Sequence, residues 1–256
     1  MTDRPLALIT GASGGIGLDL ARCAAADGYD VVLTARRKDA LEAAAGEIAS
    51  RYRVSASVTA EDLTDPEAPA RIVAGIDRPI DVLVNNAGFG IWKSFVESDA
   101  TDIDDMVRVN VAALTTLTRL VLPGMIERGR GGVLNVASVA GFMSGPHAAT
   151  YYATKNYVLA LSEALAHEVA SAGVTVSALC PGPVATGFQD RSGQGDSLVK
   201  GPMTMDAASV ARAGWSGFRS GKRVIVPGVA NKIFAQLPRV APRRLLSHAI
   251  GRVQDI

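Results

Sequence analysis

The chain has 256 residues, 48% of them hydrophobic and 20% charged, a composition typical of a soluble globular protein with a full apolar core. Its net charge of +1 does not point to nucleic acid as a partner. Charge is unevenly distributed, because Arg219–Ile256 holds eight Lys/Arg and one acidic residue, a local net charge of +7. Cys23 and Cys180 stand far apart without Cys-x-x-Cys spacing, so we expect reduced thiols and no metal site.

Targeting and membrane signals are weak in this sequence. The apolar run Leu6–Thr10 is short and leads directly into glycines, which does not fit a signal peptide. We expect no apolar run to approach the length of a membrane span. These observations predict a cytoplasmic protein.

Short β-branched runs alternate with Ala/Leu-rich segments along the chain. The helical patterns include Gly17–Asp27 and Ala40–Arg51. The central apolar runs lack alternation, as expected for parallel strands buried on both faces. This order predicts an α/β fold with one doubly wound, mostly parallel sheet of about seven strands flanked by helices. The predicted strands are residues 6–10, 30–34, 53–58, 80–86, 132–138, 174–182 and 222–228.

No linker or repeat divides the chain, so residues 1–230 are predicted to form a single dinucleotide-binding and catalytic domain. Residues 231–256 are predicted to be a basic, amphipathic extension. The segment TGASGGIG suggests the dinucleotide site, because it places Gly11, Gly15 and Gly17 between a strand and a helix. Glycines allow a sharp turn there, and the helix N-terminus offers N–H groups to a phosphate. A tight strand–helix turn without any ligand would give the same pattern.

Several motifs together resemble the short-chain dehydrogenase/reductase family. TGASGGIG is similar to its opening motif and NNAG, at Asn85–Gly88, to its second motif. Ser138, Tyr151 and Lys155 match the family's catalytic Ser and Tyr-x-x-x-Lys, and Pro181–Gly182 match the motif after a later strand. The landmarks keep the family's order over nearly the whole chain. The resemblance implies a Rossmann-like fold and hydride transfer between a nicotinamide cofactor and a carbonyl or secondary alcohol.

The end of the second predicted strand bears on the choice of nicotinamide cofactor. NAD-preferring members of the family carry an acid here, whereas this chain has Ala35 followed by Arg36 and Arg37. Guanidinium groups bind a 2′-phosphate with charge-assisted bonds, so we predict NADP(H), although the arginines could simply be solvated. The resemblance implies further cofactor contacts from Gly11, Ser13, Gly15, Ile16, Gly17, Asp62, Leu63, Asn86, Ala87, Gly88, Tyr151, Lys155, Pro181, Gly182, Val184 and Thr186. Asp62 could instead be a turn or helix-cap residue.

Two adjacent tyrosines precede Lys155, and helical spacing alone does not choose between them. The family pattern selects Tyr151 as the acid–base residue and leaves Tyr152 as a packing residue. The Lys155 ammonium is expected to lower the pKa of the Tyr151 phenol. The resemblance further implies that Lys155 bonds the nicotinamide ribose and that Ser138 polarises the substrate carbonyl.

Asn110 is implied to hold a water molecule on the proton path, although it could be an exposed or back-bonded helix residue. His147 is read as a loop residue outside the catalytic set. Ser138 lies in VASVA, without the Gly-x-Ser-x-Gly elbow of a hydrolase. A non-catalytic NADP-binding regulatory protein is the alternative function, and a sugar-nucleotide epimerase is a third.

The loop at about residues 183–206 is predicted to cover a small-molecule carbonyl or alcohol substrate. Its apolar residues, with residues 89–95, suggest a medium-sized apolar compound, although each could be ordinary core packing. The loop residues concerned are Phe188, Leu198, Val199, Met203 and Met205.

A helix starting at Pro242 would carry an apolar face with basic residues around it. It is expected to pack on the body or on a second subunit, or, less favoured, to associate weakly with an anionic membrane surface. The resemblance implies a homodimer or homotetramer with the helices of Asn110 and Tyr151 at an interface. The apolar positions of the tail helix are Leu245, Leu246, Ala249, Ile250 and Val253.

Overall fold

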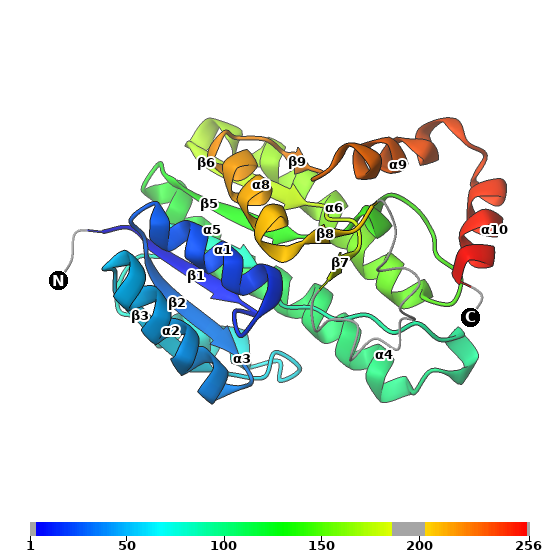
Figure 1. Ribbon diagram of the computed structural model, residues 1–256. Coiled ribbons are helices and arrows are strands. Elements are labelled where there is room, and N and C mark those ends of the chain that lie inside the picture. Colours follow the sequence, from blue (N-terminus) through cyan, green and yellow to red (C-terminus); the bar gives the residue numbers. More distant parts are fainter. Residues whose placement is uncertain (1–3, 186–202, 255–256) are drawn as a thin grey trace.

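The computed structural model describes residues 4–185 and 203–254 and is built around one seven-stranded parallel sheet (Figure 1). The strand order is β3-β2-β1-β4-β5-β6-β9, and each neighbouring pair is parallel. The order reverses beside β1, which places a ligand crevice at the carboxyl ends of β1 and β4. The strands are β1 (Leu6–Thr10), β2 (Asp30–Ala35), β3 (Ala56–Ala60), β4 (Val82–Asn85), β5 (Gly131–Val136), β6 (Val174–Leu179) and β9 (Val224–Ile225).

Helices cover both faces of the sheet (Figure 1). Both faces need cover because alternate residues of β1 present apolar side chains to opposite sides. Leu6 and Leu8 lie in one buried apolar cluster, whereas Ala7 and Ile9 lie in another on the opposite face. The first cluster contains residues of α3 (Ala68–Ala74), α4 (Ala100–Val107), α5 (Leu114–Glu127) and α6 (Ala149–Glu168). The second contains residues of α1 (Gly15–Ala26), α2 (Lys38–Tyr52) and α8 (Ala207–Arg219). The predicted doubly wound α/β fold is confirmed.

Two local features shift the boundaries that the sequence predicted. Strand β3 begins at Ala56 rather than at Arg53, because Arg53 adopts a left-handed conformation (φ 57°) that ends α2. The ends of the predicted substrate loop are joined by a second, two-stranded parallel sheet of β7 (Val184–Ala185) and β8 (Met205–Asp206).

One helical stretch corrects the prediction about apolar runs. Among the described residues, Ala100–Glu127 meets the length and composition of a membrane span, with 28 residues and a mean hydropathy of 1.4 in its best window. That window is 44% buried. Met106, Leu117 and Met125 of the same stretch pack into the core. Core helices of globular domains pass the same test.

The chain continues past β9 into α9 (Val229–Val240) and α10 (Arg243–Gln254), so the predicted domain division at residue 230 falls inside α9. These two helices lie at one end of the sheet, drawn in orange to red in Figure 1. Ile250 of α10 is buried in the same cluster as α4, α5 and α6. A Cβ on Gly251 would lie 3.4 Å from the Pro146 ring, so α10 packs on the segment before α6.

Candidate active site

The glycine turn between β1 and α1 requires glycine at three positions. Gly11 and Gly15 have φ values of 65° and 55°, a region that side chains with a Cβ adopt at a cost. A Cβ on Gly17 would lie 2.3 Å from Asn86 Nδ2 and 2.4 Å from the Gly11 carbonyl oxygen. The turn is therefore packed directly against the residue that follows β4.

Asn86 ties this turn to the neighbouring strand. Its Nδ2 donates to the carbonyl oxygens of Thr10 and Gly11 at 2.9 and 3.2 Å. The backbone N–H groups of Asn86 and Ala87 donate to Thr10 Oγ1 at 3.0 and 2.9 Å. The NNAG motif therefore fixes the glycine turn as well as bordering the crevice.

The start of α1 suits a pyrophosphate. The helix begins at Gly15 with no side-chain cap and no acidic residue in its first turn, so its N–H groups and its positive dipole end are available to an anion. A Cβ on Gly14 would meet no atom within 4 Å, so the backbone here faces open space. These residues fit the phosphate groups of a dinucleotide.

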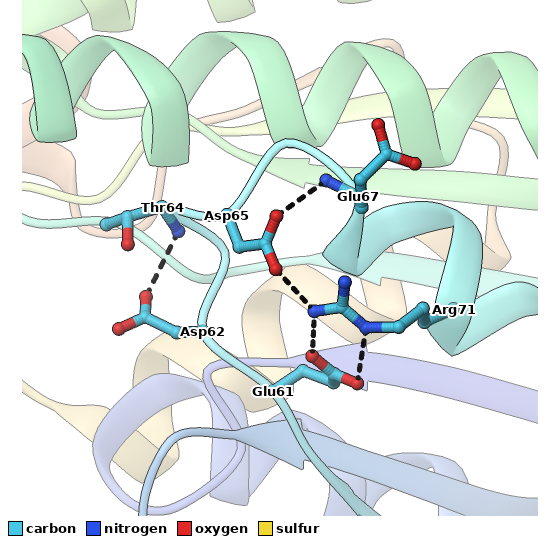
Figure 2. A network of polar contacts seen from close by, with 6 residues as sticks. All are labelled: Glu61, Asp62, Thr64, Asp65, Glu67 and Arg71. Atoms are coloured by element: carbon cyan, nitrogen blue, oxygen red, sulfur yellow. Dashed lines mark hydrogen bonds and ion pairs between the residues drawn. The ribbon is translucent and has the colours of Figure 1, made fainter.

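The predicted adenosine contacts lie together at the ends of β2 and β3. Arg36 and Arg37 are exposed, and Arg36 Nη1 lies 4.0 Å from Asp62 Oδ2. Asp62 also accepts a hydrogen bond from the Thr64 N–H at 3.0 Å (Figure 2), so it is a turn residue as well. Leu63 is buried.

A cluster of charges next to Asp62 holds this loop. Arg71 donates to both carboxylate oxygens of Glu61, at 3.1 and 2.7 Å, and to Asp65 at 2.7 Å (Figure 2). The hydrogen bond from Arg71 lowers the pKa of Glu61. The hydrogen bond from the Glu67 N–H has the largest effect on the pKa of Asp65 and lowers it, and the hydrogen bond from Arg71 lowers it further. The loop carrying Asp62 is thus bound to α3 by its own residues.

The structure brings Ser138, Tyr151 and Lys155 together on the wall of one cavity of about 400 Å³, called here the catalytic cavity. Asn86 and Gly182 border the same space, so the glycine-turn side and the β6 side of the crevice meet there. Ser138 follows β5, whereas the other two come from α6. All three side chains are buried.

Hydrogen bonds orient these three side chains. Tyr151 is hydrogen-bonded to the side chain of Ser138, whose Oγ also accepts from the Ala140 N–H at 3.1 Å. Lys155 Nζ donates to the Val136 carbonyl oxygen at 2.9 Å and lies 5.8 Å from the centre of the Tyr151 ring. Burial lowers the pKa of Lys155 to about 8.

The expectation that Lys155 lowers the pKa of Tyr151 is wrong for this arrangement. Burial raises the pKa of Tyr151 to about 12, and the hydrogen bond with Ser138 opposes that rise only in part. The physical reason is that removal from water disfavours the phenolate, and Lys155 is itself buried and less readily charged. The Tyr151 phenol therefore stays protonated at neutral pH.

Asn110 lies in a short π-helical segment, Arg108–Ala113, between α4 and α5. Its side chain is buried, with Oδ1 accepting from the Phe89 N–H at 3.0 Å and Nδ2 donating to the Phe89 carbonyl at 2.8 Å and to Thr154 Oγ1 at 3.1 Å. It is therefore not an exposed helix residue. Its side chain links the segment after β4 to α6, and its role in a proton path stays a prediction.

Sequence reasoning missed a large part of the cavity wall. The wall includes apolar side chains of both C-terminal helices, which the sequence placed outside the catalytic domain. An apolar stripe in α9 and α10 was the only available signal, and it does not reveal which surface the stripe covers. The missed residues are Val136, Ala137, Val139, Ala140, Tyr152, Phe234, Leu237, Leu246, Ala249 and Ile250.

Some of the remaining predicted residues line the catalytic cavity and others do not. Trp92 and Met203 line the catalytic cavity, as do Ile16, Gly88, Pro181 and Val184. His147 is exposed, with φ 61°, in the segment before α6. The predicted contacts Thr186, Phe188, Leu198 and Val199 lie outside the described residues.

Comparisons with known proteins agree with this geometry. Residues 5–197 match the family model described as short chain dehydrogenase. A gluconate 5-dehydrogenase from Gluconobacter oxydans is 38% identical over 188 residues, covering 72% of this chain and 73% of the relative. A very-long-chain 3-oxoacyl-CoA reductase from Anas platyrhynchos is 39% identical over 186 residues, covering 70% of this chain and 60% of the relative. This chain therefore spans less than two thirds of that longer protein.

A solved structure extends the likeness to the tail. It is a short-chain dehydrogenase from Sphingobium yanoikuyae in complex with NADPH, 33% identical, with a TM-score of 0.82, and the match covers 98% of this chain and 96% of that one. The fold and the site define a dinucleotide-dependent α/β oxidoreductase. The chain belongs to the short-chain dehydrogenase family, and its membership of a family of dehydrogenases and reductases confirms the predicted enzyme class.

Proposed function

We propose that this protein transfers hydride between NADP(H) and the carbonyl or secondary alcohol carbon of a medium-sized, largely apolar substrate. The observation that carries the proposal is the meeting of Ser138, Tyr151 and Lys155 in one apolar cavity beside the glycine turn. A regulatory protein that only binds the dinucleotide would have no need of this arrangement.

NADP(H) is the cofactor that the residues fit. The uncapped start of α1 accepts the pyrophosphate, and Arg36 and Arg37 stand at the end of β2, where an acid would disfavour a 2′-phosphate. The NADPH complex of the Sphingobium yanoikuyae relative supports the same choice. When bound, the nicotinamide supplies or accepts the hydride.

The chain itself supplies the proton and the polarisation of the carbonyl. Ser138 Oγ–H and Tyr151 O–H can both donate to a carbonyl oxygen placed between them, and Tyr151 then passes its proton to that oxygen as the carbon is reduced. A pKa of about 12 keeps the phenol protonated at neutral pH, which suits the reductive direction. Lys155 orients the cofactor and carries positive charge beside the phenol ring.

The cavity indicates the class of substrate better than the relatives do. The names of two relatives refer to a sugar acid and to very long acyl chains, which are chemically unlike. Trp92, Phe234, Leu237 and Ile250 give this cavity an apolar wall, which favours a ketone or aldehyde with a sizeable apolar group.

Exposed apolar side chains bear on the assembly of the protein. Val107, Leu120, Ile126 and Tyr157 are large apolar or aromatic side chains exposed by 41%, 43%, 42% and 39% on the helices predicted to meet a second copy. They support a homodimer or homotetramer. A cytoplasmic location and a membrane-associated tail stay predictions.

The experiment that tests the function compares two tyrosine variants of the same helix. Tyr151→Phe removes the proton donor but keeps the ring, so NADPH-dependent ketone reduction should fall by about 10²–10⁴-fold. Tyr157→Phe is the matched control, because the Tyr157 hydroxyl is hydrogen-bonded to Thr115 Oγ1 at 3.0 Å and Tyr157 does not line the catalytic cavity. NADPH absorbance measures turnover, and NADPH fluorescence measures binding. Full activity in Tyr151→Phe would contradict the mechanism.

A further inference from the structure

A second cavity, of about 440 Å³, lies directly beside the catalytic cavity and is called here the side cavity. Its walls come from the segment between β5 and α6, from the first turns of α6 and from the C-terminal helices. Phe142, Met143, Pro146 and Pro238 line it, and none of these four lines the catalytic cavity. The two spaces are therefore separate among the described residues.

Two residues line both cavities, Tyr152 of α6 and Leu246 of α10. They come from elements far apart in the chain, because Tyr152 lies in the first turn of α6 and Leu246 lies in α10. Because both side chains line both cavities, they lie at the boundary between them. Tyr152 and Leu246 together are called here the partition.

The Tyr152 half of the partition is held in place. A Cβ on Gly145 would lie 2.3 Å from Cε2 of the Tyr152 ring, so the ring rests directly on the Gly145 backbone. Asn156 Nδ2 donates to the carbonyl oxygens of Tyr152 and Met143, both at 2.8 Å, and fastens this turn of α6 to the preceding segment. Tyr152 also contacts the Tyr151 ring edge-on, with centroids 6.1 Å apart.

We propose that the partition sets the largest group the enzyme accepts on one side of the reacting carbonyl, and that the side cavity holds the excess of a larger group once the partition is trimmed. The inference rests on the proposed carbonyl reduction. It follows from position: Tyr152 adjoins the acid–base residue Tyr151, so a substituent that extends from the carbonyl toward α10 meets the partition first. The enzyme thereby selects ketones with one large and one small apolar substituent.

The test uses 1-phenylalkan-1-ones whose alkyl chain grows from methyl to hexyl. The wild type should reduce the short members and lose kcat/KM by about tenfold or more once the chain meets the partition, since pocket walls reject added methylenes by that order. Tyr152→Ala and Leu246→Ala should each raise the hexyl-to-methyl ratio of kcat/KM by about tenfold. Leu245→Ala is the matched control, because Leu245 neighbours Leu246 but is 67% exposed and lines neither cavity.

Binding separates this inference from the proposed reaction. Trp92 lines the catalytic cavity, so we expect a bound ketone to quench its fluorescence and to give a dissociation constant without turnover. If the alanine variants change the ratio of dissociation constants for the hexyl and methyl ketones but no protein turns them over, the role of the partition is upheld and the proposed reductase activity is rejected. Turnover with an unchanged ratio in both alanine variants would overturn the partition, and so would a wild type that reduces the hexyl ketone as well as the methyl one.

Discussion

The two ends of the active site are built in different ways. At the cofactor end, two short motifs of consecutive residues, the β1–α1 turn and NNAG, bind each other through Asn86 to Thr10 and Gly11, although Asn86 and Thr10 lie 76 positions apart in the chain. At the substrate end, Tyr152 and Leu246 stand more than ninety residues apart in sequence and share a wall only because α10 returns to the body. A local motif can therefore be read from sequence, whereas a cavity wall assembled from distant helices cannot.

The largest effect should come from Gly17→Ala, which tests whether cofactor binding can be lost while substrate binding is kept. The new Cβ would lie 2.4 Å from a backbone oxygen and 2.3 Å from Asn86 Nδ2, so the turn must shift. We expect the dissociation constant for NADPH to rise by about a hundredfold, as expected for about 3 kcal/mol, while ketone binding to the substrate end persists. Gly46→Ala is the control, because a Cβ there meets no atom within 4 Å. Unchanged NADPH affinity in Gly17→Ala would contradict the close packing of the turn.

Lys155 lies where the two ends meet, and its burial should reduce stability. Its folded pKa of about 8 lies below the ordinary lysine value of 10.5, so burial favours the neutral amine. The penalty is full below pH 8 and fades as pH rises toward 10.5, amounting to about 3 kcal/mol at neutral pH. Compared with wild type at the same pH, Lys155→Met should therefore be more stable at pH 7 than at pH 10.5. At pH 10.5 the variant loses only the hydrogen bond to the Val136 carbonyl oxygen, which contributes about 1 kcal/mol.

Urea unfolding of Lys155→Met and wild type at both pH values measures that difference. The exposed Lys222→Met serves as the control and should show no pH-dependent change. The same Lys155 variant should lose NADPH turnover, so stability and function would move in opposite directions. An equal stability change at pH 7 and pH 10.5 would show that Lys155 is not held as an unfavourable buried charge.

Arg36→Ala should give the smallest of these effects. It tests whether the cofactor end distinguishes NADPH from NADH. Arg36 is half exposed and 4.0 Å from Asp62, so it can reach a 2′-phosphate without disturbing the turn. Loss of a charge-assisted bond should raise the Michaelis constant for NADPH by about 10- to 100-fold and leave that for NADH nearly unchanged. Equal changes for both cofactors would remove the support for an NADP preference.

Much of the fold followed from patterns within single segments. Apolar runs at β1, β4 and β5 predicted buried parallel strands, because strands covered on both faces lack alternation. Boundaries were less accurate, since Arg53 ends α2 in a left-handed conformation that its residue type does not predict. The pKa of Tyr151 was predicted in the wrong direction, because burial raises it and burial is a property of the folded chain.

The sequence by itself determined the glycine turn, the residues Ser138, Tyr151 and Lys155, and the family, because each depends on residue type at short and regular spacing. Only the tertiary structure decided that Asn110 binds the backbone of Phe89, that Tyr152 borders two cavities, and that α9 and α10 close the substrate end. An amphipathic helix shows which of its faces is apolar, but the surface that buries that face is chosen by the packing of the whole chain.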